Sequence, residues 1–400
     1  MKNIPFSPPD ITEEEIQAVC DTLRSGWITT GPKTKQFEKE IAEYVKSAGV
    51  ACLSSATAAL ECTLRILGIG EGDEVIVPAY TYTATASVVC HVGAKLVICD
   101  VAPESFFMDY EKLGALINEK TKAIIPVDIA GIMCDYDKIF EICEQKKKLF
   151  VPKNDLQKSF GRVIVIADGA HSFGAERNGK KAGSVADFTA FSFHAVKNLT
   201  TAEGGAAVWA KKDFIDDEWL YKQFMLQSLH GQNKDALAKT KLGAWEYDIA
   251  APLYKCNMTD IMATIGLVQI KRYAEMLNKR KKFIEIYDDV LCNQRFVPLC
   301  HYTENSSSSG HLYLLRIKGI SLEQRSEIIE KMASKGIATN VHYKPLPLLT
   351  AYKDLGFDIK DYPNAYNQFC NEITLPLNTK MSEEDVRYTA ETLKEILKDY

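Results

Sequence analysis

The chain has 400 residues, of which 46% are hydrophobic and 25% are charged. A chain of this length can bury a large core and is expected to form roughly two or three domains. The formal net charge of −5 and the lack of a long basic run argue against nucleic acid or an anionic membrane surface as the main partner. The sequence contains neither a signal peptide nor an apolar run of roughly 18 residues. Its eleven cysteines are scattered without a CxxC pair, so we expect a cytoplasmic protein with buried, reduced thiols and no metal site.

Apolar runs alternate with amphipathic stretches from about residue 12 to residue 300, which is typical of an α/β fold with a mostly parallel sheet. Helices are predicted at 11–26, 31–47, 57–68 and 135–148. Strands are predicted at 50–54, 74–78, 95–100, 123–128, 163–168 and 188–193.

Several segments interrupt this pattern or follow it. The polar segment 149–162 is predicted to be a surface loop, and two helices are predicted at 259–277 and 278–293. The serine-rich segment 303–310 is predicted to be an exposed linker or loop. Two strands and two helices follow, at 311–317, 321–336, 372–377 and 382–397. We therefore expect a large α/β domain over 1–270, with N-terminal helices, and a smaller α+β domain over 271–400.

The segment LSSATAAL places Ser55, Ala56 and Thr57 where a predicted strand runs into a helix. Small residues let backbone N–H groups approach an anion, and the helix dipole and the hydroxyls favour a phosphate there. An ordinary helix N-cap would explain the same residues. The segment is a candidate phosphate site, with simple capping as the alternative.

Two ionisable residues follow strands further along the chain. Asp168 ends a strand, where α/β sheets place their ligand sites, and it could pair with a cationic ring nitrogen or cap a helix. Lys197 follows a strand, lies near Ser192 and precedes a glycine pair. A buried lysine amine can form a Schiff base, whereas a lone lysine is usually a solvated charge. The order of phosphate site, aspartate and lysine is that of a fold-type I pyridoxal-phosphate (PLP) enzyme.

Several longer motifs occur along the chain: SGWITTGPK at 25–33, SSATAAL at 54–60, VPAYTYTATA at 77–86, ADGAHSFGA at 167–175, FSFHAVKNLTTAEGG at 191–205, YKCNMTDIMATIG at 254–266 and VHYKPL at 341–346. With these motifs the chain resembles the sugar aminotransferases of the DegT/DnrJ/EryC1/StrS family along almost its whole length. The resemblance implies a fold-type I architecture and PLP as the cofactor.

The resemblance also implies roles for residues around the cofactor ring. Lys197 matches the lysine that holds PLP, and Asp168 matches the partner of its pyridine nitrogen. His171 matches a Gln/His position near the ring and its phenolic oxygen, with a core histidine as the alternative. Tyr82 is expected to stack on the ring, whereas Tyr80 is expected to pack in the core.

Further positions match phosphate contacts of the family. Ala56, Thr57 and Ser192 correspond to residues that bind the cofactor phosphate. Asn257 corresponds to an asparagine that reaches the phosphate of the neighbouring subunit's cofactor. The resemblance therefore implies a homodimer with shared active sites.

The substrate pocket is expected to involve two regions of the sequence. The segment SGWITTGPK, with Trp27, Thr29 and Gly31, is expected to help shape a sugar-nucleotide pocket. Lys255 and His342 are weaker candidates for substrate contacts, because an exposed lysine is usually only solvated.

The chain departs from the family pattern at several positions. Pro347 stands where many relatives have histidine, Gly169 replaces a common alanine or cysteine, and Cys256 stands where an aromatic residue is usual. The 149–162 segment is an atypical insertion. These departures affect the expectation for the substrate, not that for the chemistry of Lys197 and Asp168.

The resemblance implies a two-stage transamination in which L-glutamate supplies an amino group that passes to a nucleotide-linked 4-keto sugar. SGWITTGPK, SSATA and SFHAVKN are particularly similar to members that make UDP-4-amino-4-deoxy-L-arabinose and related 4-amino sugars. We expect a UDP-linked 2-acetamido-4-keto-6-deoxyhexose as the substrate, for surface polysaccharide or glycan synthesis. A 4-keto pentose for lipid A modification is the alternative.

Three other functions fit the sequence less well. A sugar 3-dehydratase of the same family would carry histidine at the position of Lys197. A non-catalytic sensor of PLP or a nucleotide sugar would not need the lysine–aspartate pair. A nucleotide-binding dehydrogenase would place its glycines between a strand and a helix, whereas GIGEG at 68–72 precedes a strand and is predicted to be a turn.

Overall fold

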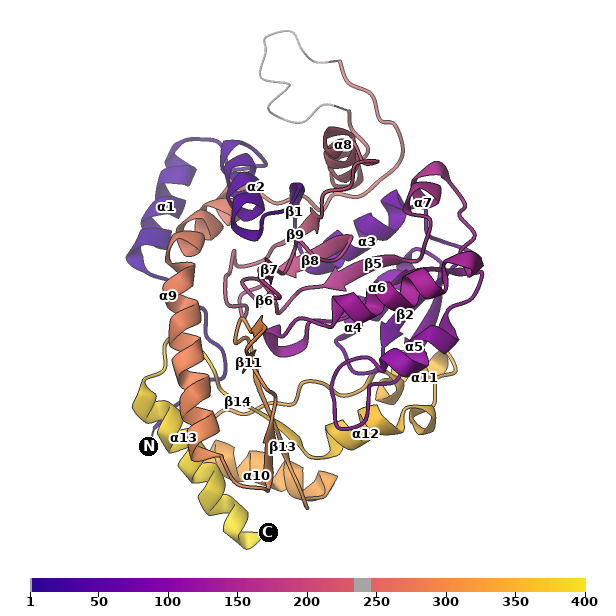
Figure 1. The fold of residues 1–400 in the computed structure, drawn as a ribbon. Coiled ribbons are helices and arrows are strands. Elements are labelled where there is room, and N and C mark those ends of the chain that lie inside the picture. The colour runs from indigo at the N-terminus through magenta and orange to yellow at the C-terminus, as the bar shows by residue number, and fades with distance from the viewer. Residues whose placement is uncertain (1, 234–245) are drawn as a thin grey trace.

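A computed structural model of the protein describes residues 2–233 and 246–400, and seven strands of these residues form a central sheet (Figure 1). The strand order is β1–β9–β8–β5–β4–β2–β3. The bounds are Gly49–Leu53 (β1), Glu74–Pro78 (β2), Lys95–Cys99 (β3), Thr121–Ile124 (β4), Ile164–Asp168 (β5), Phe188–Ser192 (β8) and Gly205–Trp209 (β9). β9 runs antiparallel to both β1 and β8, and the other pairs are parallel. The expected mostly parallel sheet is confirmed, with one antiparallel strand that was not predicted.

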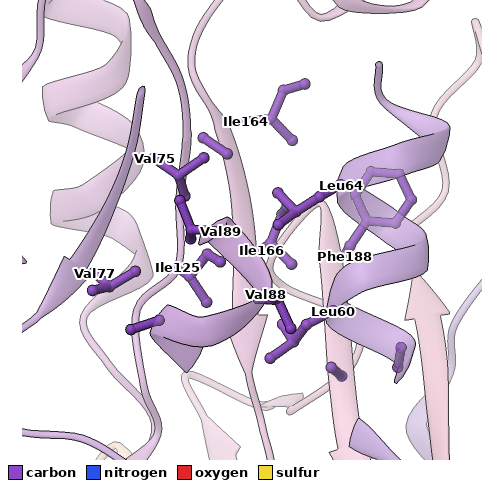
Figure 2. Close-up of a cluster of buried hydrophobic side chains, with 14 of the residues drawn as sticks. Leu60, Leu64, Val75, Val77, Val88, Val89, Ile125, Ile164, Ile166 and Phe188 are labelled. Atoms are coloured by element: carbon purple, nitrogen blue, oxygen red, sulfur yellow. The ribbon is translucent and has the colours of Figure 1, made fainter. Parts of the chain in front are cut away.

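Helices cover both faces of this sheet, which explains why its strands are continuous apolar runs. Val75 and Val77 of β2 pack in one buried cluster, while Ile76 packs in another on the opposite face. Figure 2 shows Leu60 and Val88 within the first cluster. The helices that border the sheet are α2 (Pro32–Val45), α3 (Ala56–Ile66), α4 (Thr83–His91), α5 (Tyr110–Leu116), α6 (Tyr136–Gln145) and α8 (Asp217–Ser228).

A smaller antiparallel sheet contains β10 (Phe296–Pro298), β13 (Tyr313–Ile317) and β14 (Glu372–Leu375). It packs with α10 (Leu322–Ser334) and α13 (Glu383–Ile396) around a third apolar cluster. Two short helices, α11 (Thr350–Asp354) and α12 (Pro363–Cys370), connect α10 to β14. The N-terminal helix α1 (Glu13–Arg24) lies beside α9 (Figure 1).

The two helices expected at 259–277 and 278–293 are one continuous helix, α9 (Asp260–Val290). The polar run NKRKK at 278–282 begins where the break was expected. Arg280 in this run is nevertheless buried, and its guanidinium donates to the carbonyl oxygens of Gly310 and Leu377. α9 extends from the central sheet to the small sheet (Figure 1). We propose that the division between the two domains lies within α9, near the boundary expected at residue 270.

The segment 149–162 is not only the surface loop that was expected. It contains α7 (Asp155–Phe160), whose Phe160 is 9% exposed and packs against Phe188 of the central sheet. The buried Gln157 donates through Nε2 to the carbonyl of Leu67, 2.8 Å away, at the end of α3. The insertion therefore anchors the C-terminal end of the helix whose first turn is the candidate phosphate site.

Replacing Phe160 by alanine is expected to lower the free energy of unfolding by about 3 kcal/mol, because it removes a buried ring and leaves a cavity. Urea unfolding followed by circular dichroism measures this change. Val151→Ala is the matched control, since Val151 lies in the same insertion and is 53% exposed. Equal, small losses in both variants would show that the insertion is a surface appendage.

The segment 303–310 also differs from the expected exposed linker. Tyr302–Thr303 (β11) and Ser306–Ser307 (β12) form a hairpin that pairs with Glu176–Arg177 (β6), which in turn pairs with Lys180–Lys181 (β7). Ser308 and Ser309 are buried. The composition indicated solvent exposure, but these small hydroxyl residues pack beneath the candidate site instead.

All eleven cysteines are free thiols, as expected. Their expected burial holds for Cys52, Cys62, Cys99, Cys134 and Cys143, but Cys90, Cys292 and Cys300 are exposed. Among the described residues, no helix combines the length and apolar character that a membrane span requires.

Candidate active site

A cavity of about 410 Å³ lies at the carboxyl ends of β5 and β8, beside the first turn of α3. Open α/β sheets place their ligands at this edge, because the loops that follow neighbouring parallel strands meet there. Nine of the predicted site residues line the cavity: Ser55, Ala56, Thr57, Tyr82, Asp168, His171, Ser192, Lys197 and His342. Segments that are far apart in the sequence thus converge on one site.

Asp168 lies at the end of β5 with a side chain that is almost fully buried. Thr85 Oγ1 donates to its Oδ2 at 2.7 Å, and the Ala170 amide donates to its Oδ1 at 3.1 Å. Burial raises the pKa of this carboxyl, while the two hydrogen bonds and the charge of Lys197 oppose that rise. The carboxylate is therefore held in an apolar wall by donors that favour its ionised form.

Lys197 follows β8 and reaches the cavity wall, where its side chain remains partly accessible. Burial of its amine lowers the pKa from 10.5 to about 8, although the charge of Asp168 raises it. A lysine with a pKa of about 8 has part of its amine in the neutral, nucleophilic form near neutral pH, unlike a solvated lysine. The structure thus gives Lys197 the environment that Schiff-base chemistry requires.

The first turn of α3 borders the cavity opposite these two residues. Ser55 is the N-cap, and its Oγ accepts a hydrogen bond from the Ala58 amide at 3.0 Å, so part of its role is capping. Gly205 of β9 lies so close to this turn that an added Cβ would be 2.4 Å from the Ala56 nitrogen. Ser192 lines the same end of the cavity. Hydroxyls and a helix N-terminus together form a suitable site for a phosphate.

His171 is buried in the wall and belongs to a chain of hydrogen bonds. Its Nδ1 accepts from the Ala130 amide at 3.2 Å, so its Nε2 carries the proton and donates to Tyr343 Oη at 3.0 Å. Burial holds the pKa of His171 well below its usual value, with the charge of Lys197 acting in the same direction. The imidazole is therefore neutral, and the Tyr343 hydroxyl keeps its own proton free to donate.

The floor of the site depends on the buried serine segment. Ser309 Oγ donates to the carbonyl of His171, and Asn198 Nδ2 donates to the carbonyl of Ser309 at 2.7 Å. Asn198 Oδ1 also lies 3.0 Å from His311 Nδ1, and the His311 ring contacts that of His171 at 4.4 Å between centroids. The residue next to Lys197 is thus tied to the segment that leads into β13.

The two tyrosines of the YTYTATA segment have different environments. Tyr82 lines the cavity and is 58% exposed, whereas Tyr80 is fully buried against Phe106. This placement agrees with the choice of Tyr82 over Tyr80 as the ring-stacking candidate. His342 lines the cavity as well, and its Nδ1 lies 2.9 Å from Thr374 Oγ1. Burial lowers the pKa of His342 to about 3, so this imidazole is neutral.

Five predicted residues lie outside the cavity wall and form a separate group: Trp27, Thr29, Gly31, Lys255 and Asn257. Asn257 Nδ2 donates to Thr30 Oγ1 at 2.5 Å, and Lys255 Nζ donates to Asn257 Oδ1. The Asp260 amide donates to the carbonyl of Thr29, and its carboxylate accepts from the Gly31 amide. The structure brings these segments together, but not into the cavity of their own chain.

Sequence reasoning did not identify several residues of the site. Thr85 and Tyr343 lie inside motifs that were recognised, VPAYTYTATA and VHYKPL, yet no local feature shows that they contact Asp168 and His171. Phe6, Ser7 and Asn340 also line the cavity. Their positions depend on tertiary packing, which the sequence pattern does not reveal.

The residues of the cavity fit a phosphorylated aldehyde with a basic ring nitrogen. An amine with a lowered pKa, a buried carboxylate, a helix N-terminus with hydroxyls and an exposed aromatic ring face one space. Each group matches one feature of PLP: aldehyde, ring nitrogen, phosphate and ring face. The set of side chains is therefore suited to PLP.

Comparison with known proteins identifies the family. The model of the DegT/DnrJ/EryC1/StrS aminotransferase family matches residues 9–394. The chain belongs to this family. It is 36% identical to the spore coat polysaccharide biosynthesis protein SpsC of Bacillus subtilis, over 99% of this chain and 97% of the relative. It is 33% identical to the UDP-4-amino-4-deoxy-L-arabinose–oxoglutarate aminotransferase of Shewanella sediminis, over 98% of each chain.

A solved structure is also similar along the full length. It is a putative sugar aminotransferase of Streptococcus pneumoniae in its pyridoxamine phosphate (PMP) form, with 58% identity and a TM-score of 0.97, covering 99% of this chain and 100% of that chain. The same relative was solved in a PLP form. The protein is thus an aminotransferase of a PLP-dependent family. This confirms the family, the fold-type I architecture and the cofactor that the sequence predicted.

Proposed function

We propose that this protein transfers an amino group from L-glutamate to the 4-keto group of a UDP-linked sugar, a 2-acetamido-4-keto-6-deoxyhexose, for surface polysaccharide or glycan synthesis. One observation carries the proposal: Lys197, Asp168 and the first turn of α3 line the same cavity. Burial lowers the pKa of the Lys197 amine there to about 8. A dehydratase without this lysine, or a sensor that performs no chemistry, has no need of such an arrangement.

The residues of the chain have distinct tasks in this reaction. PLP, when bound, supplies the carbonyl that takes up the amino group and a ring that accepts negative charge. Lys197 holds the cofactor, takes a proton from the substrate carbon and returns it, since its amine changes protonation near neutral pH. Asp168 places a negative charge in the wall where a ring nitrogen is expected, and this charge keeps that nitrogen protonated.

The names of relatives support a sugar nucleotide as the amino-group acceptor. The Bacillus relative is named for spore coat polysaccharide synthesis, and the Shewanella relative for UDP-4-amino-4-deoxy-L-arabinose. Beyond Lys197 the cavity is lined by Ser7, Asn340 and His342, whose polar atoms suit sugar hydroxyl or acetamido groups. The departures from the pentose enzymes in the second half of the chain favour the hexose. A UDP-linked 4-keto pentose is the second candidate.

We further propose that the enzyme acts as a homodimer with shared sites. Tyr82, Val196, Ile28 and Tyr254 are large apolar residues between 40% and 58% exposed. Ile28 and Tyr254 belong to the segments of the separate group, while Tyr82 and Val196 line the cavity. A partner subunit that covered these side chains could bring its Asn257, Lys255 and Trp27 segments to this cavity.

The cytoplasmic location expected from the composition stays a prediction.

An absorbance spectrum of the purified protein with PLP tests the proposal. We expect a band near the visible edge that L-glutamate converts to the spectrum of the pyridoxamine form. UDP-2-acetamido-4-keto-6-deoxyhexose is then expected to restore the first band and to yield a 4-amino sugar, detected by mass spectrometry. The UDP-4-keto pentose is the matched comparison substrate.

The outcomes separate the alternatives. Restoration by the pentose alone would replace the hexose by the second candidate. A band that no amino acid changes would contradict transamination and favour the sensor. Conversion by glutamate without reversal by either UDP sugar would retain the aminotransferase and reject the proposed acceptors.

A further inference from the structure

Two cysteines from distant parts of the chain meet beside the active site. Cys62 lies on α3, and Cys256 precedes Asn257, with the two sulfur atoms 4.0 Å apart. Cys62 is 2% exposed, whereas Cys256 is of intermediate exposure. Two thiols at this separation can simply pack as small apolar groups. Their unequal exposure and the connections of both segments to the site suggest a further role.

Both cysteines belong to elements that are directly tied to the site. The carbonyl of Cys256 accepts from the Ser54 amide at 2.8 Å, next to the N-cap of α3, and its amide donates to Ser228. Asn257 forms an isolated bridge with Leu53, the last residue of β1. A change in the distance between the two sulfur atoms therefore acts on the first turn of α3, on the Asn257 segment, or on both.

We propose that Cys62 and Cys256 form a reversible redox site, in which a peroxide converts the two thiols to a disulfide that weakens the binding of PLP. The first part rests on the sulfur–sulfur contact of 4.0 Å and on the unequal exposure of the two thiols within one subunit. The effect on PLP rests also on the proposed phosphate role of the first turn of α3. A disulfide has a bond of about 2.05 Å, so the sulfur atoms must approach each other by roughly 2 Å.

The surroundings of Cys256 favour ionisation of its thiol, which a redox site requires. The hydrogen bond from Cys62 lowers the pKa of the Cys256 thiol, and the charge of Lys255 acts in the same direction against the effect of burial. By contrast, burial raises the pKa of the Cys99 and Cys143 thiols to about 12. A cysteine whose pKa is lowered and that lies beside a second cysteine is the arrangement found in redox-sensing proteins.

The reaction balances with hydrogen peroxide as the oxidant. The Cys256 thiolate attacks one peroxide oxygen, the O–O bond breaks, and hydroxide leaves as the sulfenic acid forms. The sulfur of Cys62 then displaces the sulfenic oxygen, the S–S bond forms, and the thiol proton leaves with that oxygen as water. The two sulfur atoms lose two electrons in total, which reduce one peroxide to water. A dithiol reductant reverses the change by thiol–disulfide exchange.

Peptide mapping of the full-length protein tests the disulfide itself. After treatment with hydrogen peroxide and alkylation of the free thiols, trypsin is expected to release residues 47–65 linked to residues 256–271. Because Cys52 lies on the first peptide, tandem fragmentation must assign the link to Cys62. We expect this link in the wild type, its loss on adding dithiothreitol, and its absence from Cys62→Ala and Cys256→Ser.

Cys300→Ser, which removes an exposed thiol, is the matched control and is expected to keep the link. In Cys62→Ala, Cys256 is expected to stop at the sulfenic acid, which dimedone traps. Thermal unfolding checks that each variant folds, and the wild-type map is decisive even where a variant does not. A peroxide-treated wild type without the 62–256 link would overturn the redox site.

The effect on the cofactor is measured by titrating PLP into reduced and oxidised protein. We expect the disulfide to raise the Kd of PLP roughly tenfold, reversibly, in the wild type and in Cys300→Ser only. A fully linked protein with unchanged PLP affinity would overturn the coupling to the site. Neither readout requires turnover of a sugar, so failure of the proposed sugar substrate leaves this test intact.

Discussion

Replacement of Lys197 by alanine is expected to lower the turnover number at least about a thousandfold, because the amine that moves the proton is lost. The absorbance band of the lysine-bound cofactor is expected to disappear, while circular dichroism and the oligomeric state remain unchanged. Steady-state kinetics with L-glutamate and the keto sugar measure the loss. Lys318→Ala is the control, since Lys318 is an exposed lysine directly after β13 of the small sheet. Turnover near that of the wild type would show that Lys197 takes no part in the reaction.

The same variant has a second signature in the protein without PLP. Burial lowers the pKa of Lys197 in the folded state to about 8, from the ordinary 10.5. Between these values the unfolded chain binds more protons than the folded chain, so the wild type gains stability as the pH rises. Below pH 8 the folded state bears the full cost of the buried charge. We expect Lys197→Ala to lack this pH-dependent gain, which thermal unfolding between pH 7 and pH 10 would reveal.

The sequence was informative wherever local pattern determined structure. β2 and β3 were predicted at almost their observed bounds, because their apolar runs are short and continuous. β9 was missed although it has five buried residues, GAAVW: small residues after a glycine pair do not indicate a strand. Its place is fixed by antiparallel pairing with β8, the preceding strand, and with β1, which lies far away in the sequence.

Three errors in the predicted fold have one physical cause. Polar residues were assigned to solvent, although several of them are buried with hydrogen-bond partners. Arg280 interrupts the apolar pattern of α9, but its Nη1 donates to two carbonyl groups. Gln157 in the insertion and Ser309 in the serine-rich segment are buried for the same reason. A one-dimensional pattern cannot show which polar groups find a partner in the folded chain.

In the candidate site too, some residues could be predicted from the sequence and others could not. Ser55, Asp168 and Lys197 follow or precede predicted strands, so a parallel sheet brings them to one edge whatever the details of packing. Thr85 and Tyr343 contact the side chains of Asp168 and His171 and could not be found this way. Such supporting residues set protonation states, and their identification needs coordinates.

The second large effect is expected for Asp168→Asn, which keeps the size of the side chain but removes its charge. We expect PLP to remain bound and the turnover number to fall by about a hundredfold to a thousandfold, because a preorganised charge opposite the ring nitrogen is lost. Thr389→Val is a suitable control, because it also removes a polar group from a buried side chain. Thr389 is fully buried in α13 and does not line the cavity. An Asn variant with wild-type turnover would show that Asp168 only caps the loop after β5.

Thr85→Val provides a graded test of the same charge. Its hydroxyl lowers the pKa of Asp168, so its removal is expected to raise that pKa further. A carboxyl is neutral below its pKa, so activity on the acid side of the pH profile should be lost at a higher pH than in the wild type. Asp168→Asn should instead be impaired at every pH. A loss of activity in Thr85→Val that does not vary with pH would mean that Thr85 acts by packing alone. A shift of the acid side of the pH profile to higher pH would instead show that catalysis depends on the ionised Asp168 carboxylate, which Thr85 stabilises.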